Sequence, residues 1–560
     1  MLVFRYNNTM NLLTKFDHLN LETAIKTQLV SAMDALIEQA RLEAEQLSAT
    51  LKVMDAELAS KTAEIKLKDI KIEALTLELS ILRRTHFSIK SESLPAVQRD
   101  LFEDTWNEDI AAVEAQVEQL VDEQPSTTVA KPKRPRAGRQ PLPEHLPRIE
   151  HRHEPESCQC GQCGKDLVKI GEDITEQLDV EPARFFVHRH IRPQYACKAC
   201  ETVTAAPIAP AIIDGGMAAV GLLTWVMIGK YQDHLPLYRL EQIAARDEVI
   251  LSRSTLADWV GRVGVALQPL VDRLAWHLLQ RNALHADETP VAQLDPGHGK
   301  TKKAYLWAYR SNDLEPGHRI IVFDYQPGRS GAHARHFLGH WHGHLMVDDY
   351  GGYKSLFAVE REGAPPCIEL GCMAHARRKF FDLHKANDSP MALEALQRIA
   401  RLYAIEADGK LMDIEARKQL RQEKSQPELT ALHDWLIETR ARTANGGGSA
   451  KALDYAIKRW PALIRYADSG HLPIDNNPVE NSIRPIAIGK KNWLFAGSER
   501  GGQRAAAIQT LLGTAKLNGL NPAQWLKDTL EKLPVWSNSR IDELLPFAVA
   551  DIKQQQEVLE

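Results

Sequence analysis

Leu284-His-Ala-Asp-Glu-Thr289 and Leu345-Met-Val-Asp-Asp-Tyr-Gly-Gly-Tyr353 each place an acidic pair at the end of a short apolar run. Short apolar runs bounded by polar residues predict strands. Four such runs follow residue 280, namely 283–287, 304–309, 320–325 and 344–348. Asp287 and Asp348 would then stand at the ends of adjacent strands, where carboxylate oxygens can converge on a hard divalent cation.

A third acidic residue, Glu480, lies in the stretch Ile474-Asp-Asn-Asn-Pro-Val-Glu-Asn-Ser-Ile-Arg484. Asn477 is the predicted N-cap of a helix and Pro478 its first residue, which puts Glu480 at the third helical position. A carboxylate there can simply close a capping box, and it can pair with Arg484 one turn later. Taken one at a time, each of the three acids is better explained by a structural role than by catalysis.

Length and composition exclude several classes of protein for this sequence. The 560 residues include 69 Lys and Arg against 74 Asp and Glu, for a net charge of -5, with 44% hydrophobic and 26% charged residues. At about 150 residues per domain, this length predicts about three to four domains. No apolar run approaches the roughly 20 residues that cross a bilayer, and no secretory leader is recognisable. We therefore expect a cytoplasmic protein without a membrane partner, in which DNA contact comes from local basic patches.

The first 95 residues predict a coiled coil. Apolar residues recur every seven positions, at Leu51, Leu58, Ile65, Ile72 and Leu79. A heptad pattern favours the association of two or more helices. The alternative is an amphipathic helix that packs on its own domain, but no neighbouring core sequence supports it. We expect a homo-oligomer.

An acidic stretch at 100–125 is followed by Lys131-Pro-Lys-Arg-Pro-Arg-Ala-Gly-Arg139, which is basic and interrupted by proline and glycine. Such a segment cannot pack a core and predicts a disordered linker. Its cations can equally follow a phosphate backbone or enter a minor groove. Solvated linker and DNA contact both remain open as interpretations.

Five of the seven cysteines lie between Cys158 and Cys200. Two Cys-x2-Cys knuckles supply the four thiolates that a tetrahedral structural Zn2+ requires, Cys160 with Cys163 and Cys197 with Cys200. The interval between the knuckles has room for strands, which predicts a zinc-ribbon-like module. Cys158 is a spare that can replace Cys160 as a ligand. Seven cysteines are too few for a disulfide scaffold and indicate a reducing compartment.

The segment Pro236–Arg246 predicts a helix opened by proline, and Ser252 is a good N-cap for a second helix. Two helices of this kind are what a helix-turn-helix presents to the major groove. The candidate DNA contacts open the second helix: Arg253, Ser254 and Thr255. Helix pairs without a DNA function are common, and the turn has Glu248 where a glycine is expected.

These features closely resemble the transposases of the insertion sequence 66 family over nearly the whole chain. The cysteine knuckles contribute, together with the segments 83–92, 234–239 and 252–259. The most specific motifs are His285-Ala-Asp-Glu-Thr289, Val347–Tyr353, Ala374-His-Ala-Arg-Arg-Lys-Phe380, Asp475-Asn-Asn-Pro-Val-Glu-Asn481 and Lys490–Arg500. Members of the family are bacterial DDE enzymes with a retroviral-integrase-like, RNase H-like catalytic domain, and the resemblance implies that fold here.

The resemblance also implies that Asp287, Asp348 and Glu480 form the DDE triad, which holds two Mg2+ (or Mn2+) ions, with Asp287 as the bridging ligand. Two such ions about 3.5 to 4 Å apart activate the attacking oxygen and stabilise the leaving oxygen. Asp349 and Glu248 stand where the family more often has glycine. Phosphate contacts are expected from nearby cationic residues: His375, Arg377, Arg378, Lys379, Arg484, Lys490, Lys491 and Arg500.

The expected architecture is multidomain α+β. In chain order we expect an N-terminal coiled coil, a linker, a zinc-binding module, a helix-turn-helix region, an RNase H-like catalytic domain and a C-terminal helical segment. A stretch rich in helix-forming residues at about 388–465 predicts a helical insertion in the catalytic domain. The expected boundaries are 1–95, 96–148, 149–205, 206–278, 279–510 and 511–560.

The expected function is that of a DNA transposase, which binds terminal inverted repeats and catalyses two-metal cleavage and strand transfer. One alternative is a sequence-specific DNA-binding regulator with an inactive nuclease domain, which the presence of all three acids disfavours. Another is an RNase H-like nuclease that cuts without joining. The implied partners are DNA, both element ends and target, a second copy of the chain and accessory proteins of the same element, with nucleoid association when bound.

Overall fold

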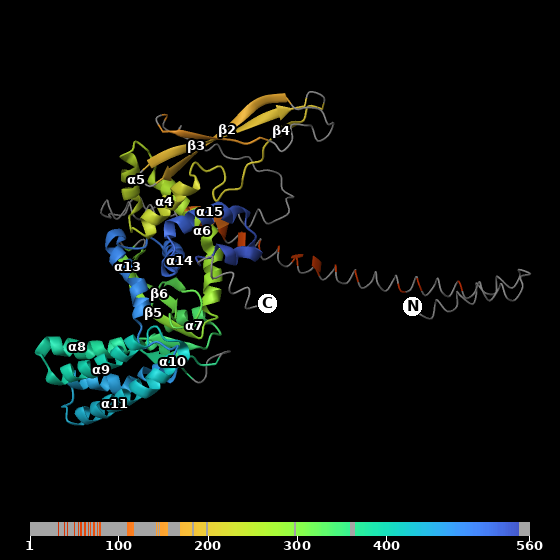
Figure 1. Cartoon of the computed structure of the whole chain (residues 1–560). Helices are drawn as coiled ribbons and strands as arrows, with labels where there is room; N and C mark the ends of the chain where they lie inside the picture. The colour runs from red at the N-terminus through yellow and green to blue at the C-terminus, as the bar shows by residue number, and fades with distance from the viewer. Residues whose placement is uncertain are drawn as a thin grey trace, which may run out of the picture. The chain divides into compact units, whose positions relative to one another are not determined.

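A computed structural model describes seven continuous stretches of the chain and isolated positions between 32 and 79 and at 142, 144 and 298 (Figure 1). The continuous stretches are 109–116, 146–154, 168–181, 184–197, 200–295, 300–358 and 365–547. The chain divides into two compact units, residues 1–77 with 119–128 and residues 78–118 with 129–560. The remainder of the predicted coiled coil and the basic segment 131–139 lie outside the described residues.

In the first unit, the described positions are helical. Two apolar side chains of the heptad pattern are exposed there, Leu58 at 65% and Ile65 at 43% of their full accessible area. Met54, three residues after Leu51 and at the second apolar position of the same repeat, is exposed at 59%. Exposed apolar side chains repeated at this spacing form a surface that another helix can cover.

In the second unit, residues 109–116 are helical and a four-stranded sheet follows them. β2 (Val168–Glu181) and β3 (Arg184–Ala196) form a long antiparallel hairpin, β1 (Arg148–Arg152) pairs parallel to β3, and β4 (Val203–Ala205) pairs antiparallel to the end of β3. Alternate residues of a strand point to opposite faces, so one face of the hairpin can be apolar. The residues that enter the core shared with the following helices are Leu178, Val180, Phe185 and Val187.

Three helices follow, α4 (Val220–Tyr231), α5 (Leu237–Ala245) and α6 (Arg253–Leu278). The predicted N-cap of α6 is confirmed, because the Ser252 hydroxyl accepts a hydrogen bond from the Thr255 amide at 3.2 Å. The helix α5 begins one residue later than predicted, since Pro236 is its N-cap and not its first residue.

The turn between α5 and α6 explains why a glycine is expected there. Glu248 has a φ angle of 59°, in the left-handed region that costs an ordinary residue about 1–2 kcal/mol and costs glycine almost nothing. The backbone keeps the conformation of a glycine turn although the side chain is that of glutamate. The predicted pair of helices with a tight turn is therefore present.

A mixed five-stranded sheet follows, with the strand order β7-β6-β5-β8-β9. β5 (Ala283–Asp295), β6 (Lys300–Ser311) and β7 (Ile321–Gln326) are antiparallel, whereas β8 (His344–Val347) and β9 (Ile368–Gly371) run parallel to β5. The four strands predicted from apolar runs are confirmed. β5 and β6 extend beyond their predicted runs, and β9 is too short and too polar to be recognised by its pattern.

Helix α14 (Glu499–Leu517) covers the outer edge of this sheet. The backbone amides of Ile321 and Phe323 in β7 donate to the hydroxyls of Thr514 and Thr510, at 3.2 and 2.8 Å, and both threonines are fully buried. These hydroxyls satisfy backbone donors that no neighbouring strand reaches.

The long interval between β9 and α13 (Asn477–Trp493) is helical. It contains α8 (Met373–Asn387), α9 (Pro390–Asp408), α10 (Ile414–Leu420), a π-helical turn (Arg421–Ser425), α11 (Gln426–Ala441) and α12 (Gly448–Leu463). The core of these helices includes Ala283, Met346 and Leu370 of the sheet, so the helices pack on one of its faces.

The remaining helices complete the second unit. α7 (Gly331–Leu338) precedes β8, and α15 (Pro522–Lys532) packs against α4. The segment 533–547 continues in short 3-10 turns and contributes Leu544 and Phe547 to the core around α6. In the part of the chain that the structure describes, no helix has both the length and the apolar content needed to cross a membrane.

Arg421 connects the helices of the long interval from a fully buried position. Its guanidinium forms a two-pronged pair with the Glu406 carboxylate at 2.8 and 2.5 Å and donates to the carbonyls of Tyr466 and Leu472, each at 2.9 Å. Removal of one partner of a buried pair leaves the other charge unpaired, which costs about 3–5 kcal/mol.

Arg421→Met should therefore loosen helices α9 to α12 by about 3–5 kcal/mol, seen as faster amide exchange in hydrogen–deuterium exchange mass spectrometry. The matched control is Lys424→Met, which removes an exposed cation 3.9 Å from Asp408 and should change stability by less than about 0.5 kcal/mol. Equal exchange rates in the two variants would contradict the role given to Arg421.

Candidate active site

The parallel pairing of β5 and β8 brings Asp287 and Asp348 to the same level of the sheet. His285 is the register partner of Met346, and each aspartate lies two residues further along its own segment. Since side chains alternate between faces, Asp287 shares a face with Ala283 and His285, and that face is covered by α8 and α13. The two aspartates therefore meet beneath helices that come from much later in the sequence.

Glu480 enters the same site from the first turn of α13. The helix begins at Asn477 with Asn476 as its N-cap, one residue earlier than predicted. In the predicted capping box, the Glu480 carboxylate would accept a hydrogen bond from the amide of Asn477, the predicted N-cap. That amide instead donates to Asp475 Oδ1 at 3.1 Å, so the capping-box interpretation is wrong. The amide of Asn476, the actual N-cap, donates to Cys372 Sγ at 3.2 Å.

An imidazole, a guanidinium and a thiol surround the Glu480 carboxylate. One oxygen lies 3.8 Å from His375 Nδ1 and the other 3.6 Å from a guanidinium nitrogen of Arg378. Within the described stretches, the ion pairs of Glu480 do not include Arg484, which is exposed. The ligand atoms of Cys372, His375 and Glu480 all lie within 4.8 Å of one another. Glu480 Oε1 and His375 Nδ1 are buried without a hydrogen-bond partner among the described residues, which suits both to a ligand.

The side chain of Asn476 fixes α13 to the sheet. Its Oδ1 lies 3.0 Å from His285 Nδ1, and its Nδ2 donates to the Ala286 carbonyl at 2.9 Å. Together with the amide bond to Cys372, these contacts join β5, the start of α8 and the start of α13 through one fully buried residue. Sequence reasoning treated this asparagine only as part of a family motif, although two consecutive asparagines before a proline exceed what one helix cap needs.

Negative charges are concentrated around Asp287. The pKa of this aspartate is raised to about 8, first by burial and then by the charges of Glu288, Asp348 and Glu480. A hydrogen bond from the Glu288 amide to Asp287 Oδ1, at 2.9 Å, acts in the opposite direction. A divalent cation relieves such a concentration of charge, and oxygen ligands are what Mg2+ and Mn2+ prefer. The donor set of this site therefore fits a hard divalent metal.

The second acid of each acidic pair is held by a cation outside this cluster. Glu288 points to the opposite face of β5, where its carboxylate accepts from Arg329 Nε at 2.8 Å and from the Tyr353 hydroxyl at 2.7 Å. Asp349 lies 3.4 Å from Arg459 of α12. Because side chains alternate along a strand, Glu288 points away from Asp287. Asp349 pairs with an arginine of the helical segment between β9 and α13.

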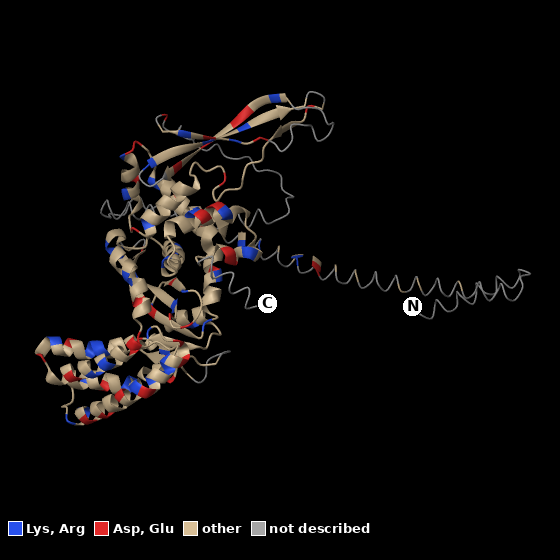
Figure 2. Cartoon of the chain, viewed as in Figure 1, with Lys and Arg blue, Asp and Glu red and all other residues tan. Residues whose placement is uncertain are grey.

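The predicted phosphate contacts near the site differ in their surroundings. Five are exposed on α8 or α13, namely Arg377, Arg378, Lys379, Arg484 and Lys491. Lys490 donates to the Pro290 carbonyl at 3.0 Å. Arg500, at the start of α14, donates from Nε to the Glu78 carboxylate at 2.6 Å. Figure 2 shows basic and acidic residues interspersed over the second unit, in keeping with contact through local patches.

The predicted contacts at the start of α6 take part in local interactions. Arg253 lies 3.2 Å from the Glu241 carboxylate of α5. The hydroxyls of Ser254 and Thr255 lie 2.9 and 2.8 Å from that of Ser252. These interactions shape the beginning of the second helix of the pair.

The second cysteine knuckle forms a tight turn between β3 and β4. The Cys197 amide donates to the Thr202 carbonyl, and the Glu201 amide donates to the Cys197 carbonyl, both at 2.9 Å. Cys197 is buried and Cys200 is half-buried. The other predicted ligands, Cys160 and Cys163, and the spare Cys158 lie outside the described residues.

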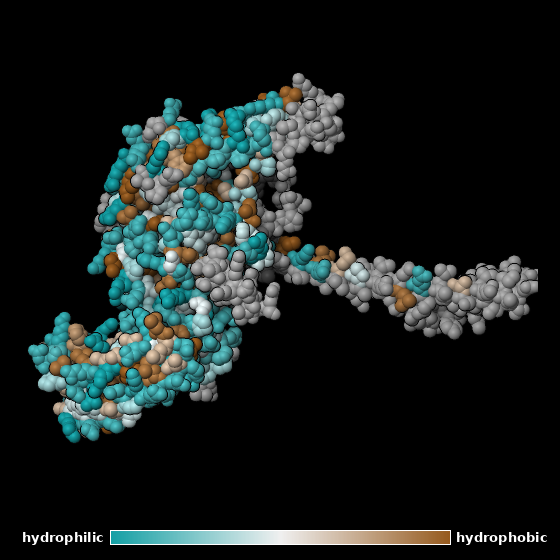
Figure 3. Space-filling view, viewed as in Figure 1, coloured by the Kyte–Doolittle hydropathy of each residue, from teal (hydrophilic) through white to brown (hydrophobic). Residues whose placement is uncertain are grey.

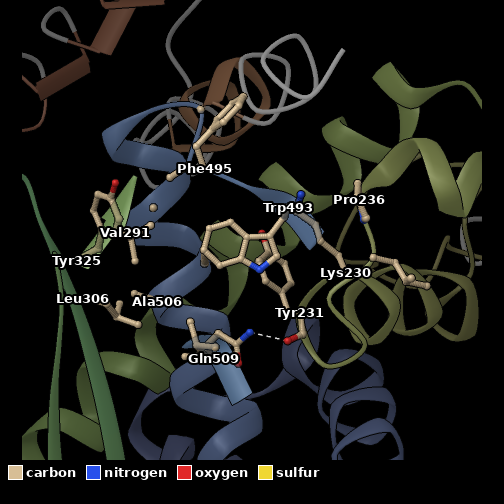
Figure 4. A pocket seen from close by; sticks show the side chains of 17 residues that line it. Lys230, Tyr231, Pro236, Val291, Leu306, Tyr325, Trp493, Phe495, Ala506 and Gln509 are labelled. Carbon is tan, nitrogen blue, oxygen red and sulfur yellow. Dashed lines mark hydrogen bonds between the residues drawn. The ribbon is translucent and has the colours of Figure 1, made fainter. Parts of the chain in front are cut away.

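Trp493 is a packed residue at the end of α13. It contacts the core between the sheet and α13, and it lines a largely apolar pocket with Tyr231, Tyr325 and Phe495 (Figure 4). The Gln509 side chain donates to the Tyr231 carbonyl at the wall of this pocket.

Four family matches cover most of the chain. The sequence matches the Transposase IS66 family over residues 215–504, more than half of the chain. It also matches the zinc-finger binding domain of transposase IS66 over 157–201, the IS66 C-terminal element over 510–547 and Transposase C of IS166 homeodomain over 74–150. These matches identify a transposase of the DDE type. The chain belongs to the IS66 family of transposases.

Relatives of similar length occur in Sinorhizobium fredii (strain NBRC 101917 / NGR234), each described as an uncharacterized protein. The protein y4qI is 37% identical, with 92% of this chain and 96% of its own length covered. The protein y4jD is 38% identical over 72% of this chain and 81% of its own, and y4hP is 33% identical over 85% and 88%. Family membership implies DNA as a partner and a divalent metal as cofactor, and the zinc-finger match indicates zinc.

Asp287→Asn should stabilise the metal-free protein, and should do so more at high pH. With a folded pKa of about 8 against an ordinary value of 3.8, the native state binds more protons than the unfolded state between these pH values. Stability therefore falls as pH rises through this window. In EDTA at pH 8, the unfolding midpoint of the variant should exceed that of the parent by about 2–4 °C or more, the shift that about 1 kcal/mol produces in a domain of this size.

Near pH 4 the two midpoints should differ far less, because the carboxyl is then protonated in the folded state and about half protonated in the unfolded state. Asp295→Asn, at the far end of the same strand, serves as the control and should show no such pH dependence. A stabilisation of Asp287→Asn that is equal at pH 4 and pH 8 would argue against shared charge in this site.

Proposed function

We propose that this transposase binds the terminal inverted repeats of a bacterial insertion sequence and catalyses metal-dependent DNA cleavage and strand transfer. In this proposal, Asp287, Asp348 and Glu480 hold two Mg2+ or Mn2+ ions. The observation that carries it is that three acids from distant parts of the sequence face one site, where Asp348 and Glu480 help to raise the pKa of Asp287.

An RNase H-like fold is the proposed architecture of the catalytic domain, at residues 279–510. The sheet supports this proposal, because three antiparallel strands are followed by two strands parallel to the first. The acids lie on the first strand, after the fourth strand and on a later helix. The helices between β9 and α13 fall largely within the expected insertion at 388–465.

When bound, the two ions would activate the attacking oxygen and stabilise charge on the leaving oxygen. Asp287 is the proposed bridging ligand, because its pKa responds to both other acids. Asn476 positions Glu480 by holding the start of α13 against β5. His375 and Arg378 stand beside Glu480 and can neutralise a phosphate that approaches it.

DNA contact is proposed for two groups of residues. The first surrounds the acidic site: His375, Arg377, Arg378, Arg484, Lys490, Lys491 and Arg500. The second opens α6: Arg253, Ser254 and Thr255. The tight α5–α6 turn supports the second group, because a helix-turn-helix presents the start of its second helix to a groove.

A structural Zn2+ is proposed at Cys160, Cys163, Cys197 and Cys200. The zinc-finger match over 157–201 and the tight turn around Cys197 and Cys200 support this ligand set.

Self-association is proposed through the N-terminal helix. Apolar side chains lie among its described positions (Figure 3), and Leu58 and Ile65 are exposed at the heptad spacing. Cytoplasmic location, nucleoid association and cooperation with accessory proteins of the same element complete the proposal.

Two alternatives share part of this architecture. A DNA-binding regulator would need neither the clustered acids nor the buried contacts that hold Glu480 in place, and both are present. A nuclease that cuts without joining would use the same acids, so it differs only in its product.

Asp287→Asn, Asp348→Asn and Glu480→Gln should each lower Mg2+-dependent cleavage and strand transfer on a labelled element end by roughly 100-fold or more, the scale expected when one charged group leaves a preorganised site. Each change keeps side-chain size and removes one ligand charge. DNA binding, measured by gel shift, should survive. Asp349→Asn is the matched control and should retain most activity.

The result separates the alternatives. Cleavage without joined product, with accessory proteins present, would favour the nuclease. DNA binding without any cleavage by the parent protein would favour the regulator.

A further inference from the structure

The sequence His-Arg-His occurs twice, at 151–153 and at 188–190. The first copy lies at the end of β1 and the second within β3, and in the parallel pairing of these strands His151 is the register partner of His190. Residues two apart on a strand share a face, so the four imidazoles gather on one side of the sheet. The ring centroid of His151 lies 5.0 Å from that of His188 and 5.0 Å from that of His190.

The imidazoles are joined in two pairs through ring nitrogens. His151 Nε2 lies 2.8 Å from His188 Nδ1, and His153 Nε2 lies 3.1 Å from His190 Nδ1. Two nitrogens bound to one tetrahedral ion at about 2.0–2.1 Å stand about 3.3–3.4 Å apart. A displacement of a few tenths of an ångström would therefore turn each hydrogen-bonded pair into a pair of metal ligands.

The outer nitrogens of the two histidines on β3 are anchored to β2. His188 Nε2 lies 2.8 Å from Asp179 Oδ2, and His190 Nε2 lies 3.1 Å from Gln177 Oε1. These oxygens accept hydrogen bonds, so the Nε2 atoms carry protons, and in the neutral form of each ring the lone pair is then on Nδ1. A metal-binding histidine is oriented in the same way, with its second nitrogen donating to a carboxylate or a carbonyl oxygen.

Four imidazoles this close cannot all be protonated without strong repulsion, and the neutral ring is the form that binds metal.

This cluster is separate from the cysteine knuckle. His190 and Cys197 are seven residues apart along an extended segment, or roughly 20 Å at about 3.3 Å per residue. An ion at the histidines would therefore be additional to the proposed structural zinc.

We propose that the paired histidines bind a borderline divalent transition metal such as Zn2+, Ni2+ or Cu2+. Each pair offers two nitrogen ligands to an ion. His151 and His188 form one pair, and His153 and His190 form the other. Water completes the coordination of the bound metal. Imidazole ligands favour these ions over Mg2+. A bound ion would join β1 to β3 by a bridge additional to the backbone ladder. The proposal does not depend on the transposase function.

The test is Cu2+ binding by the full-length protein after its cysteine site has been loaded with Zn2+. Electron paramagnetic resonance should show Cu2+ with nitrogen ligands, and mass spectrometry of the metal content should show metal beyond the zinc of the cysteine site. His188→Ala combined with His190→Ala should weaken this binding at least about 10-fold. Asp179→Asn should weaken it about 10-fold, because a neutral amide oxygen accepts more weakly from the outer nitrogen of His188 than a carboxylate does.

Two further variants keep the test decisive if the double variant fails to fold. His153→Gln changes one exposed ligand at the end of β1 and should remove the second pair without disturbing the sheet. His342→Ala, an exposed histidine elsewhere, is the matched control and should bind as the parent does. Nitrogen-ligated Cu2+ that is absent from the parent, or equally strong in all variants, would overturn the proposal.

Discussion

The geometry of the acidic site depends on one buried amide. Asn476 bonds with both ends of its side chain to β5 and with its backbone to Cys372, so three segments far apart in the sequence meet at a single residue. A buried polar group left without partners costs about 1–3 kcal/mol, which makes these contacts directional in a way that apolar packing is not. Glu480 follows four residues later, and its position relative to Asp287 is a consequence of this anchor.

The apolar core offsets the unfavourable free energy of burying the acidic residues around Asp287. Asp287 is buried with a raised pKa beside other carboxylates, an arrangement that opposes folding when no cation is present. Large apolar layers lie on both faces of the sheet, with Trp307 and Tyr309 on one face and Leu306 and Phe323 on the other. The site is thus a local source of instability held within a well-packed sheet, as is common where binding requires charge.

The sequence predicted the strands and helices of this site better than the way they are arranged in space. Apolar runs ending in acids predicted β5 and β8, because burial on both faces leaves a clear local pattern. The register that aligns His285 with Met346 has no local signal, since it depends on strands that pair across 61 residues of sequence. The N-cap of α13 was misplaced by one residue because two consecutive asparagines both suit that position, and tertiary contacts with His285 and Cys372 select the first.

The histidine cluster also depends on a strand pairing that has no local signal in the sequence. Its repeated His-Arg-His is visible in the sequence, but only the pairing of β1 with β3 reveals that the two copies face one another. Glu248 shows the opposite case. The turn between α5 and α6 has the left-handed backbone that such a turn usually requires, but the residue there is glutamate and not the expected glycine.

The threonines of α14 have a consequence for assembly. A sheet edge with unpaired amides is a template for a strand from another molecule. Thr510 and Thr514 occupy these amides on β7 from within the same chain. A second copy or a partner protein therefore cannot extend the sheet at this edge by β-strand addition.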